Sequence, residues 1–283
     1  MTTYTSMDDL KSAVQDYWDR EPCDTRYARS VERLSWFREI ESSRYDSEPN
    51  ILELAQFEKA KGLDVLEIGV GAGIDFSQWV RVGASAVGTD LTGQALALTK
   101  EYLDLQQIDP RSYRLLRADA EQLQFPDESF DIVYAYGVLH HTPNTVAAFR
   151  EAIRVLRKGG RLKCMIYHSP SWTAINLWLY HGLLKLRPWK SLKKIMFEKL
   201  ESPGTKAYSV SEARELLRQA GCPQCKITLF LGTGDLMDLK LGRKYDNNVV
   251  VRMAQKLYPR KLVKMLDGKQ ARLGIFMHIE TIK

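Results

Sequence analysis

The sequence predicts a doubly wound α/β fold around a mostly parallel sheet. Between residues 62 and 168, short apolar runs alternate with stretches of about ten to fifteen residues that have helical spacing. This alternation is typical of βαβ crossovers, in which each helix returns the chain to a parallel strand. The run at 63–69 is almost continuously apolar, as expected for a strand buried on both faces, and it opens directly into a glycine-rich turn.

Helices are predicted ahead of the sheet, because 7–18, 31–40 and 50–60 each show apolar residues at 3.6-residue spacing. A proline-containing break separates the first two. We therefore expect a helical N-terminal lid over 1–60, followed by the core of the fold over 61–168.

Seven strands and their connecting helices follow in order. The strands are predicted over 63–69, 84–90, 113–119, 129–137, 161–168, 225–231 and 273–282. The helices between them are predicted over 76–82, 93–105, 146–156 and 210–220. Lys158, Gly159 and Gly160 are expected to form the turn that leads into the fifth strand.

Two insertions interrupt the alternation after residue 168. We expect a basic helical insertion over 169–209, and a second at 234–272 within the end of the core, 210–283. The charge follows this division: residues 1–160 hold 18 Lys and Arg against 26 Asp and Glu, a net of −8, and 161–283 hold 23 against 9, a net of +14, which together give the +6 of the chain. The asymmetry suggests two tasks in one chain, with the hypothesis that the basic half faces an anion or a membrane.

Composition excludes several classes of protein. Apolar residues make up 45% and charged residues 27%, which argues against a disordered or fibrous chain. The N-terminus has neither the basic nor the apolar region of a signal peptide, so a cytoplasmic location with reduced cysteines is expected. The longest apolar stretch, Trp172–Leu186, is too short to span a bilayer. Cys222 and Cys225 have the CxxC spacing, but no second pair accompanies them, so no metal site is predicted.

The glycine-rich turn carries the motif on which the function depends. Residues 64–75 read DVLEIGVGAGID, with glycines at 69, 71 and 73. Such glycines allow a tight turn and close approach of a ligand to bare backbone, although they also occur in turns without a ligand. The dinucleotide fingerprint would need a glycine at position 74, where Ile74 stands, so the surrounding residues have to identify the ligand.

Three carboxylates do so. Glu67 lies two residues before the first glycine, where it suits the ammonium group of a ligand. Asp90 ends the second strand, at the position where a carboxylate binds ribose hydroxyls. Asp119 ends the third strand, where it suits an adenine amino group. The simpler interpretation of Asp90 and Asp119 is that they cap helices.

These segments resemble the class I S-adenosylmethionine-dependent methyltransferases. LEIGVGAG is similar to their first motif, GTDLT to the acidic end of their second strand, RADAEQLQFPDESFDIVYAYGVLHHTPN to their third and fourth strands, and RVLRKGGRL to the helix and turn before their fifth. The likeness is greatest to the branch of ubiquinone and menaquinone biosynthesis and related small-molecule enzymes; it covers 62–168 and resumes weakly at 206–231. It implies a Rossmann-like methyltransferase fold that uses S-adenosyl-L-methionine, releases S-adenosyl-L-homocysteine and needs no metal.

The resemblance also implies the cofactor site. The three glycines would line the methionine part, Asp90 would hold the ribose and Asp119 would reach the adenine. Arg44 and Tyr45, ahead of the glycine loop, are expected to reach the carboxylate of the cofactor; the alternative is that they are surface helix residues with a buried aromatic anchor. The complete set of predicted cofactor-binding residues is Arg44, Tyr45, Glu67, Gly69, Gly71, Gly73, Asp90, Leu91, Asp119, Ala120, Tyr136, Gly137 and His141.

A base and an acceptor site are predicted next to it. Alignment of the reactants can supply about 7–11 kcal/mol, and a base is required only if the nucleophile arrives protonated. His140 and His141, just beyond the fourth strand, are the predicted catalytic residues; the alternative is one packed ring and one that borders the cofactor. The predicted substrate residues are Tyr17, Trp18, Arg26, Tyr27 and Trp172. The first four are expected to form an aromatic lid with one cation; the alternative is that they are surface helix residues with buried aromatic anchors.

The two basic insertions are expected to determine the acceptor. Four interpretations stay open: helical caps with solvated basic faces, amphipathic helices on a membrane surface or over a lipid-like substrate, a soluble anionic substrate, and RNA. The leading hypothesis is a cytoplasmic or peripheral membrane enzyme that methylates O, N or C of a small, hydrophobic or anionic molecule. A tRNA-modifying methyltransferase, disfavoured because the sequence has no separate RNA-binding motif, and a non-catalytic cofactor-binding partner subunit are the alternatives. The acceptor and the oligomeric state do not follow from the sequence.

Overall fold

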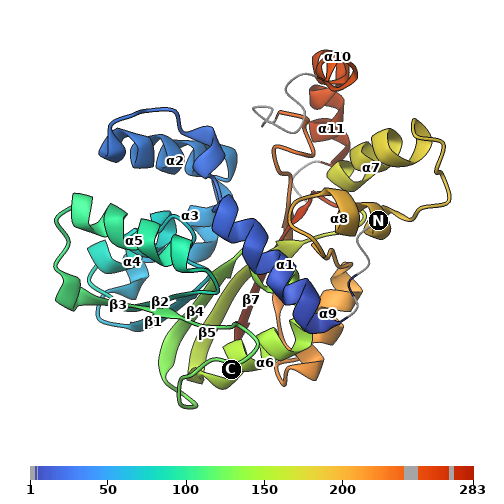
Figure 1. Ribbon diagram of the computed structural model, residues 1–283. Helices are drawn as coiled ribbons and strands as arrows, with labels where there is room; N and C mark the ends of the chain where they lie inside the picture. The colour runs from blue at the N-terminus through green and yellow to red at the C-terminus, as the bar shows by residue number, and fades with distance from the viewer. Residues whose placement is uncertain (1–3, 5, 239–247, 268–270) are drawn as a thin grey trace.

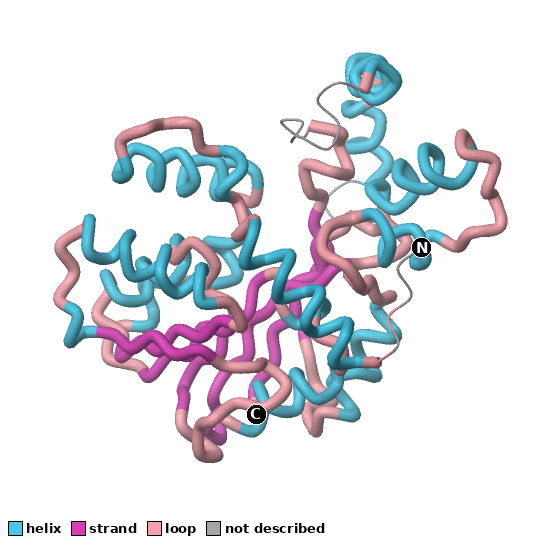
Figure 2. The backbone as a smooth tube through the Cα atoms, in the orientation of Figure 1, coloured by secondary structure: helices cyan, strands magenta, loops and turns pink. Residues whose placement is uncertain are grey.

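The computed structural model describes residues 4, 6–238, 248–267 and 271–283, which form one seven-stranded sheet flanked by helices (Figures 1 and 2). The strands are β1 (Asp64–Ile68), β2 (Ser85–Asp90), β3 (Tyr113–Arg117), β4 (Phe130–Tyr136), β5 (Leu156–Tyr167), β6 (Lys226–Phe230) and β7 (Phe276–Ile282). Their order is β3-β2-β1-β4-β5-β7-β6, and all neighbours are parallel except the two pairs that β7 makes. The predicted mostly parallel, doubly wound sheet of seven strands is confirmed.

The two faces of the sheet bury different side chains, as the alternation of strand residues requires. Leu66 and Val133 belong to the core that also holds the apolar residues of α6 (Thr145–Arg154) and α9 (Val210–Gln219). The neighbouring Val65 and Ile132 belong to the opposite core, with the buried Trp79 of α4 (Ile74–Arg81). The helix α5 (Gly93–Leu105) packs beside α4 on that second face.

The turn predicted at residues 158–160 is wrong, because this segment belongs to β5. Helix α6 ends at Arg154, and Leu156 already pairs with Phe130 of β4. The register then shifts, so that Ile132 pairs with Arg161. Gly159 takes up the irregularity with a φ of +80°. The glycines therefore accommodate a bulge within a strand instead of a turn between two elements.

The helices ahead of the sheet are α1 (Met7–Arg20), α2 (Arg33–Ser47) and α3 (Asn50–Ala55). A capping box at Ser6 and Asp9 fixes the start of α1. The helix predicted over 50–60 is shorter than expected, because Gln56 adopts a left-handed φ of +53° and ends it. A 3₁₀ turn over Phe57–Ala60 completes the segment. Helix α1 crosses the sheet in front of its carboxyl edge, where it covers the site described below (Figure 1).

The two insertions gather at one end of the sheet (Figure 1). They contain α7 (Trp172–Trp178) with a π-helical continuation (Leu179–Leu183), α8 (Leu192–Lys199), α10 (Val249–Leu257) and α11 (Arg260–Asp267). Residues 239–247 and 268–270 of the second insertion lie outside the described residues. Among the helices that are described, none combines the length and apolarity needed to cross a membrane.

The buried Asp235 ties both insertions to the sheet. Its Oδ1 accepts hydrogen bonds from the backbone N–H of Thr173 at 2.8 Å and from the Thr173 hydroxyl at 2.7 Å. Its Oδ2 accepts from the N–H groups of Gly232 at 2.9 Å and Ile275 at 2.8 Å. One carboxylate therefore joins the start of α7, the segment after β6 and the segment before β7.

Candidate functional site

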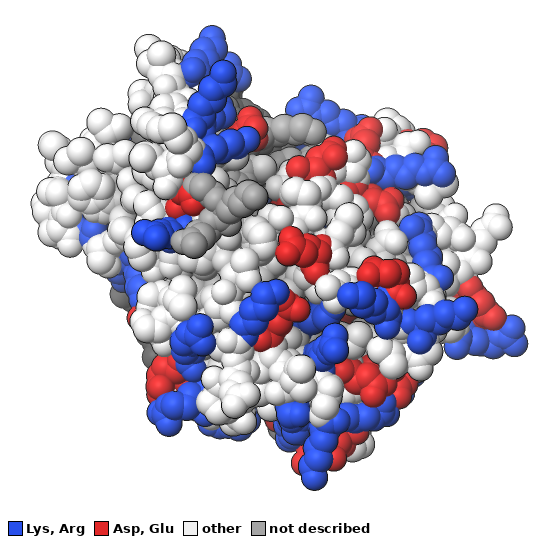
Figure 3. Space-filling model, turned by 180° about the vertical axis from the view of Figure 1, so that it is seen from behind, with Lys and Arg blue, Asp and Glu red and all other residues white. Residues whose placement is uncertain are grey.

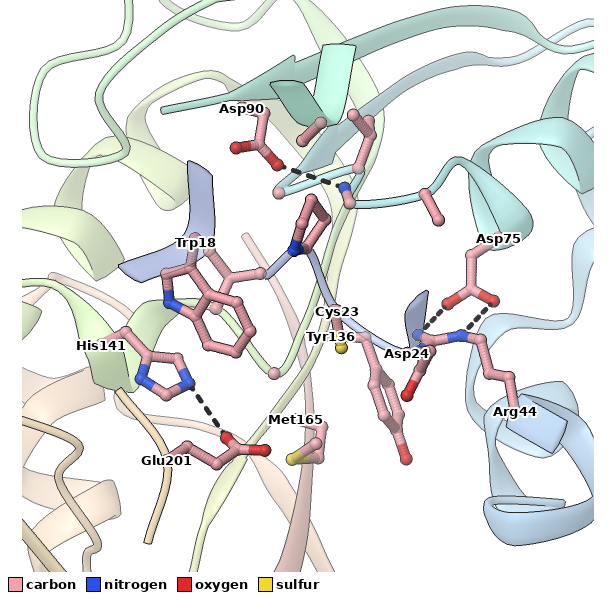
Figure 4. A pocket seen from close by; sticks show the side chains of 18 of the residues that line it. Trp18, Cys23, Asp24, Arg44, Asp75, Asp90, Tyr136, His141, Met165 and Glu201 are labelled. Atoms are coloured by element: carbon pink, nitrogen blue, oxygen red, sulfur yellow. Dashed lines mark hydrogen bonds and ion pairs between the residues drawn. The ribbon is translucent and has the colours of Figure 1, made fainter. Parts of the chain in front are cut away.

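A cavity of about 520 Å³ opens at the carboxyl ends of β1, β2 and β4, beneath α1 (Figure 4). This is the edge at which open α/β sheets bind their ligands. Its walls come from the glycine loop, the ends of β2, β4 and β5, the N-terminal helices and the segment around Glu201. Most of the residues predicted for the cofactor and for the substrate therefore meet around one hollow.

The three glycines of the loop have different surroundings. All three have positive φ, +80° at Gly69, +56° at Gly71 and +81° at Gly73. Gly69 and Gly71 line the cavity. Gly73 does not; it begins α4 and packs so closely on α5 that a Cβ would lie 2.8 Å from the Cα of Thr99. The predicted cofactor contact of Gly73 thus gives way to a packing role.

Asp90 is held in place at the end of β2. Its Oδ2 accepts from the N–H of Gly71 at 3.2 Å (Figure 4). Its Oδ1 accepts from the N–H and the hydroxyl of Thr92, each at 2.9 Å. A carboxylate has about four acceptor positions, so this arrangement fixes the group and still leaves one for a ligand hydroxyl. Leu91 lines the cavity beside it.

Asp119 and Ala120 also line the cavity, beyond β3. The Lys11 ammonium of α1 donates to Oδ2 of Asp119 at 2.6 Å and to Glu121 at 2.7 Å. Lys11 was not predicted as a site residue. Its two ion pairs connect α1 to the segment after β3 that lines the cavity.

Glu67 is a buried carboxylate with an unused oxygen. It is 3% exposed, and its Oε2 has no hydrogen-bond partner in the structure. Burial, together with the nearby charge of Asp75, raises the pKa of Glu67 well above its usual range. Because an unpaired buried polar atom is costly, this oxygen is suited to an N–H group of a ligand.

Arg44 reaches the cavity but is engaged by the protein. Its Nε and Nη2 donate to the two oxygens of Asp75 at 3.0 and 2.6 Å, and its Nη1 donates to Asp24 at 3.0 Å (Figure 4). A guanidinium has five N–H groups, so two are left for a ligand carboxylate. Tyr45 does not line the cavity; its hydroxyl donates to Asp75 at 3.1 Å and thereby positions Arg44 indirectly.

The two predicted catalytic histidines differ in position. His141 lines the cavity, with Nδ1 at 2.9 Å from the Ser202 hydroxyl and Nε2 at 3.6 Å from Glu201 (Figure 4). His140 is fully buried and lies outside the cavity wall, with neither ring nitrogen hydrogen-bonded. Burial lowers the pKa of His141 to about 3 and that of His140 well below its usual range. The position of His140 does not support a role as base, and His141 is a weak one at neutral pH.

The predicted substrate residues separate in the same way. Tyr17, Trp18, Arg26 and Tyr27 line the cavity from the N-terminal segment. Trp18 packs edge-on against His141 with ring centroids 5.4 Å apart. Trp172 does not reach the cavity, because its indole N–H donates to Asp267 at 3.2 Å and connects α7 to α11.

Several lining residues were not predicted. These are Glu48, Glu201 and Tyr167. Tyr136 and Gly137, in contrast, were predicted at the end of β4 and line the cavity there. The Tyr167 hydroxyl donates to Glu201 at 2.8 Å. The signal for Asp75 is present in the motif GAGID, whereas Glu48 and Glu201 lie in segments without a motif.

The chain is similar in sequence to known methyltransferases. Residues 66–164 match the family model described as a methyltransferase domain. The chain is 30% identical over 120 residues to an uncharacterized methyltransferase, YcgJ, of Bacillus subtilis, covering 41% of this chain and 46% of that one. It is 29% identical over 163 residues to a demethylmenaquinone methyltransferase of Tropheryma whipplei, covering 56% and 66%. The chain thus spans between about half and two thirds of these relatives.

Solved structures share the fold. The phosphoethanolamine N-methyltransferase 2 of Haemonchus contortus, solved in complex with S-adenosyl-L-methionine, superimposes with a TM-score of 0.58 at 16% identity. The superposition covers 95% of this chain and 60% of that one. At this identity the likeness concerns the fold alone.

Proposed function

Because residues 66–164 are a class I S-adenosylmethionine-dependent methyltransferase domain, close to the branch of ubiquinone and menaquinone biosynthesis, we propose that the chain transfers a methyl group from S-adenosyl-L-methionine to a small molecule. The observation that carries the proposal is the pairing of Asp90 with the N–H of Gly71 at the wall of the cavity. It joins the glycine loop to the carboxylate that suits a ribose, on adjacent strands.

The residues that line the cavity fit this cofactor. Asp90 would accept from a ribose hydroxyl, and Asp119 from the adenine amino group. The backbone at Gly69 and Gly71 would lie against the methionine part, with the unpaired Oε2 of Glu67 toward its ammonium group. The two unused N–H groups of Arg44 would bind its carboxylate.

The protein's own contribution to the reaction is mainly alignment. When bound, the cofactor supplies a sulfonium methyl group that is ready for in-line displacement. Tyr136, Met165 and Tyr167 wall the cavity beyond the glycine loop, and Trp18 covers it from α1. These side chains would hold the acceptor in line and exclude water, which can lower the barrier by about 7–11 kcal/mol.

Titration calorimetry with S-adenosyl-L-homocysteine tests the cofactor site. Removing a hydrogen bond to a charged group costs about 1.5–3 kcal/mol, so we expect Asp90→Asn to weaken binding by roughly 10- to 100-fold. The control is Asp109→Asn, a half-exposed carboxylate in the loop after α5. Unchanged affinity of Asp90→Asn, or no binding by the wild type, would contradict the proposal.

Labelled S-adenosyl-L-methionine, incubated with the protein and a fractionated cell extract, tests the transfer itself. We expect the label in small molecules. Label in RNA would favour the tRNA-modifying alternative, and an absence of label despite cofactor binding would favour a non-catalytic subunit.

A further inference from the structure

The cavity is far more acidic than the chain. Ten carboxylates line it against three cations, a formal net charge of −7 that the raised pKa values of Glu48 and Glu67 make less negative, while the chain as a whole has a formal net charge of +6. The carboxylates are Glu21, Asp24, Asp46, Glu48, Glu67, Asp75, Asp90, Asp119, Glu201 and Asp238, and the cations are Lys11, Arg26 and Arg44. An anionic acceptor would meet strong repulsion here.

Most of these charges already have a function in the cavity. Arg44 pairs with Asp24 and Asp75, and Lys11 pairs with Asp119. Glu67 and Asp90 belong to the proposed cofactor site. Glu48 and Glu201 are the remaining lining carboxylates that are not exposed, and each feels the charge of a cation, Glu48 that of Arg44 and Glu201 that of Arg26.

Glu48 and Glu201 approach the same aromatic side chain. The Tyr167 hydroxyl donates to Glu201. The pKa of Tyr167 is raised mainly by burial, and the negative charges of Glu201 and Glu48 raise it further. Oε2 of Glu48 is buried without a hydrogen-bond partner. Burial raises the pKa of Glu48 to about 7, so this group exchanges a proton near neutrality. A buried oxygen without a partner is suited to a hydrogen-bond donor on the acceptor.

Aromatic rings line the same cavity as this pair. Tyr17, Trp18, Tyr27, Tyr136 and Tyr167 all line the cavity. Two of the rings already face a cation: the Arg26 guanidinium lies 4.9 Å from the centre of Tyr27, and that of Arg44 lies 5.3 Å from the centre of Tyr136. The faces of such rings attract ammonium groups.

We propose that the acceptor is an amine, held as an ammonium ion between Glu48 and Glu201 within this aromatic wall; the inference rests on the proposed function. The ammonium ion gives one proton to a carboxylate of the pair, which frees the lone pair on nitrogen. That lone pair forms the new N–C bond as the C–S bond breaks, and the electron pair of the C–S bond stays on sulfur. The product is a methylated ammonium ion, and the proton on the carboxylate passes to solvent.

The position of the transferred methyl group tests the inference, whichever amine the acceptor is. The protein is incubated with S-adenosyl-L-methionine carrying a ¹³C-methyl group and the small-molecule fraction of a cell extract. We expect a labelled product that a cation-exchange resin retains at neutral pH, with a ¹³C-methyl resonance typical of an N-methyl group. A methyl group on oxygen, carbon or sulfur, or no labelled small molecule from a protein that binds the cofactor, would overturn the amine. Failure to bind S-adenosyl-L-homocysteine would instead overturn the proposed function.

Matched variants test the two carboxylates with the product so identified. We expect Glu48→Gln and Glu201→Gln each to raise the KM for the amine about tenfold, with little change in the affinity for S-adenosyl-L-homocysteine. Glu201→Asp should raise the KM less than Glu201→Gln does, because aspartate keeps the negative charge. Glu215→Gln, on the exposed face of α9, is the control. An unchanged KM in both cavity variants would refute the role of the pair.

A second, independent observation concerns α10 and α11. Apolar side chains of both helices project into solvent, with Leu257 78% and Met265 70% exposed. The whole set of large exposed apolar residues in the two helices is Val249, Val250, Met253, Leu257, Leu262, Met265 and Leu266. Exposed apolar patches of this kind mark interaction sites in soluble and peripheral proteins.

The charge of these helices indicates the partner. Residues 249–267 contain five Lys or Arg and one acidic residue, Asp267, a net of +4. Asp267 is buried, where it accepts from Trp172 and from the N–H of Leu273, so the exposed charges are positive. Figure 3 shows Lys and Arg side chains along the projecting end of the molecule to which α10 and α11 belong.

The geometry points to an anionic lipid bilayer as the partner of α10 and α11. Apolar side chains flanked by Lys and Arg are typical of helices that lie in the interface of a membrane. Each Lys or Arg near an anionic surface contributes about 1 kcal/mol, and the apolar residues add burial in the acyl region.

Sedimentation with vesicles tests this surface. We expect the protein to bind vesicles of phosphatidylcholine with about 30% phosphatidylglycerol, and to be released by about 0.5 M NaCl. The variant Met253→Ser/Leu257→Ser should bind about tenfold more weakly, whereas Leu52→Ser, an exposed apolar residue on α3, should bind like the wild type. Equal binding to pure phosphatidylcholine, no binding, or a dimer in light scattering that the double variant abolishes would overturn the proposal.

Discussion

The close contact between Gly73 and α5 makes a stability prediction that separates two effects of glycine. Gly73 has a φ of +81°, and a Cβ there would lie 2.8 Å from the Cα and 2.9 Å from the Oγ1 and Cγ2 of Thr99. The nearest atom belongs to the backbone, so no side-chain rotation relieves the clash. Gly62 is the matched control, because its φ of +74° is similar and a Cβ there would meet no atom within 4 Å.

The expected magnitudes follow from these distances. Alanine in the left-handed region costs about 1–2 kcal/mol at either position. Overpacking adds about 1–3 kcal/mol, and only at position 73. We therefore expect Gly62→Ala to lower the free energy of unfolding by about 1–2 kcal/mol and Gly73→Ala by about 2–5 kcal/mol.

Urea unfolding of the two variants and the wild type measures the difference. Any change in the entropy of the unfolded chain is the same for both Gly→Ala substitutions and cancels in their comparison. Gly71→Ala adds a second contrast: its Cβ would lie 3.8 Å from the Cβ of Cys23, an ordinary contact, but at the wall of the cavity. It should unfold like Gly62→Ala and lose affinity for S-adenosyl-L-homocysteine. Equal unfolding midpoints for Gly62→Ala and Gly73→Ala would refute the reasoning.

Three further predictions concern buried charges. Burial raises the pKa of Glu48 to about 7 from 4.5, so the folded state holds a proton that the unfolded state releases. Relative to Glu48→Gln, the stability of the wild type should therefore fall between pH 4.5 and 7, by at most about 3 kcal/mol in urea unfolding at a series of pH values. Burial lowers the pKa of Lys163 from 10.5 to about 8, so the sign is reversed: relative to Lys163→Met, wild-type stability should rise between pH 8 and 10.5, again by at most about 3 kcal/mol. Asp235→Asn should lower the free energy of unfolding by roughly 3 kcal/mol. Both oxygens of Asp235 accept from buried N–H groups, and the asparagine would replace one of these oxygens by an NH₂ group that cannot accept. A loss below about 0.5 kcal/mol would contradict this.

The sheet and the cofactor side of the cavity could be predicted because both are written in local patterns. A strand buried on both faces needs a nearly continuous apolar run, and β1 and β4 have one that only isolated carboxylates interrupt. The chain then has to turn sharply at the carboxyl end of β1, which requires the glycines. Asp90 could be located because it comes immediately at the end of a strand.

The acceptor side could not be predicted in this way, because it is assembled from distant segments. Glu48 follows α2 and Glu201 follows α8, and neither stands in a motif or a periodic stretch. Composition alone assigns Trp172 to the substrate, yet its indole is directed to Asp267. His140 and His141 are adjacent in the sequence, so the sequence gives no sign that they differ in position. The ring of His141 faces the cavity, whereas the ring of His140 packs between those of His141 and Tyr167.

The distribution of charge joins the two sides of the molecule in one physical argument. A formal net charge of +6 would lead one to expect a protein that attracts anions, but carboxylates outnumber cations by ten to three among the residues that line the cavity. The two potentials act separately, because salt screens exposed charges beyond about 8 Å at physiological ionic strength, whereas charges inside a cavity are screened much less. An anionic surface is therefore attracted to α10 and α11 without its headgroups being drawn into the cavity, and a cation is favoured inside. The anionic acceptor that the basic insertions suggested is disfavoured for the same reason: the basic residues lie on the outer surface, and the carboxylates line the site.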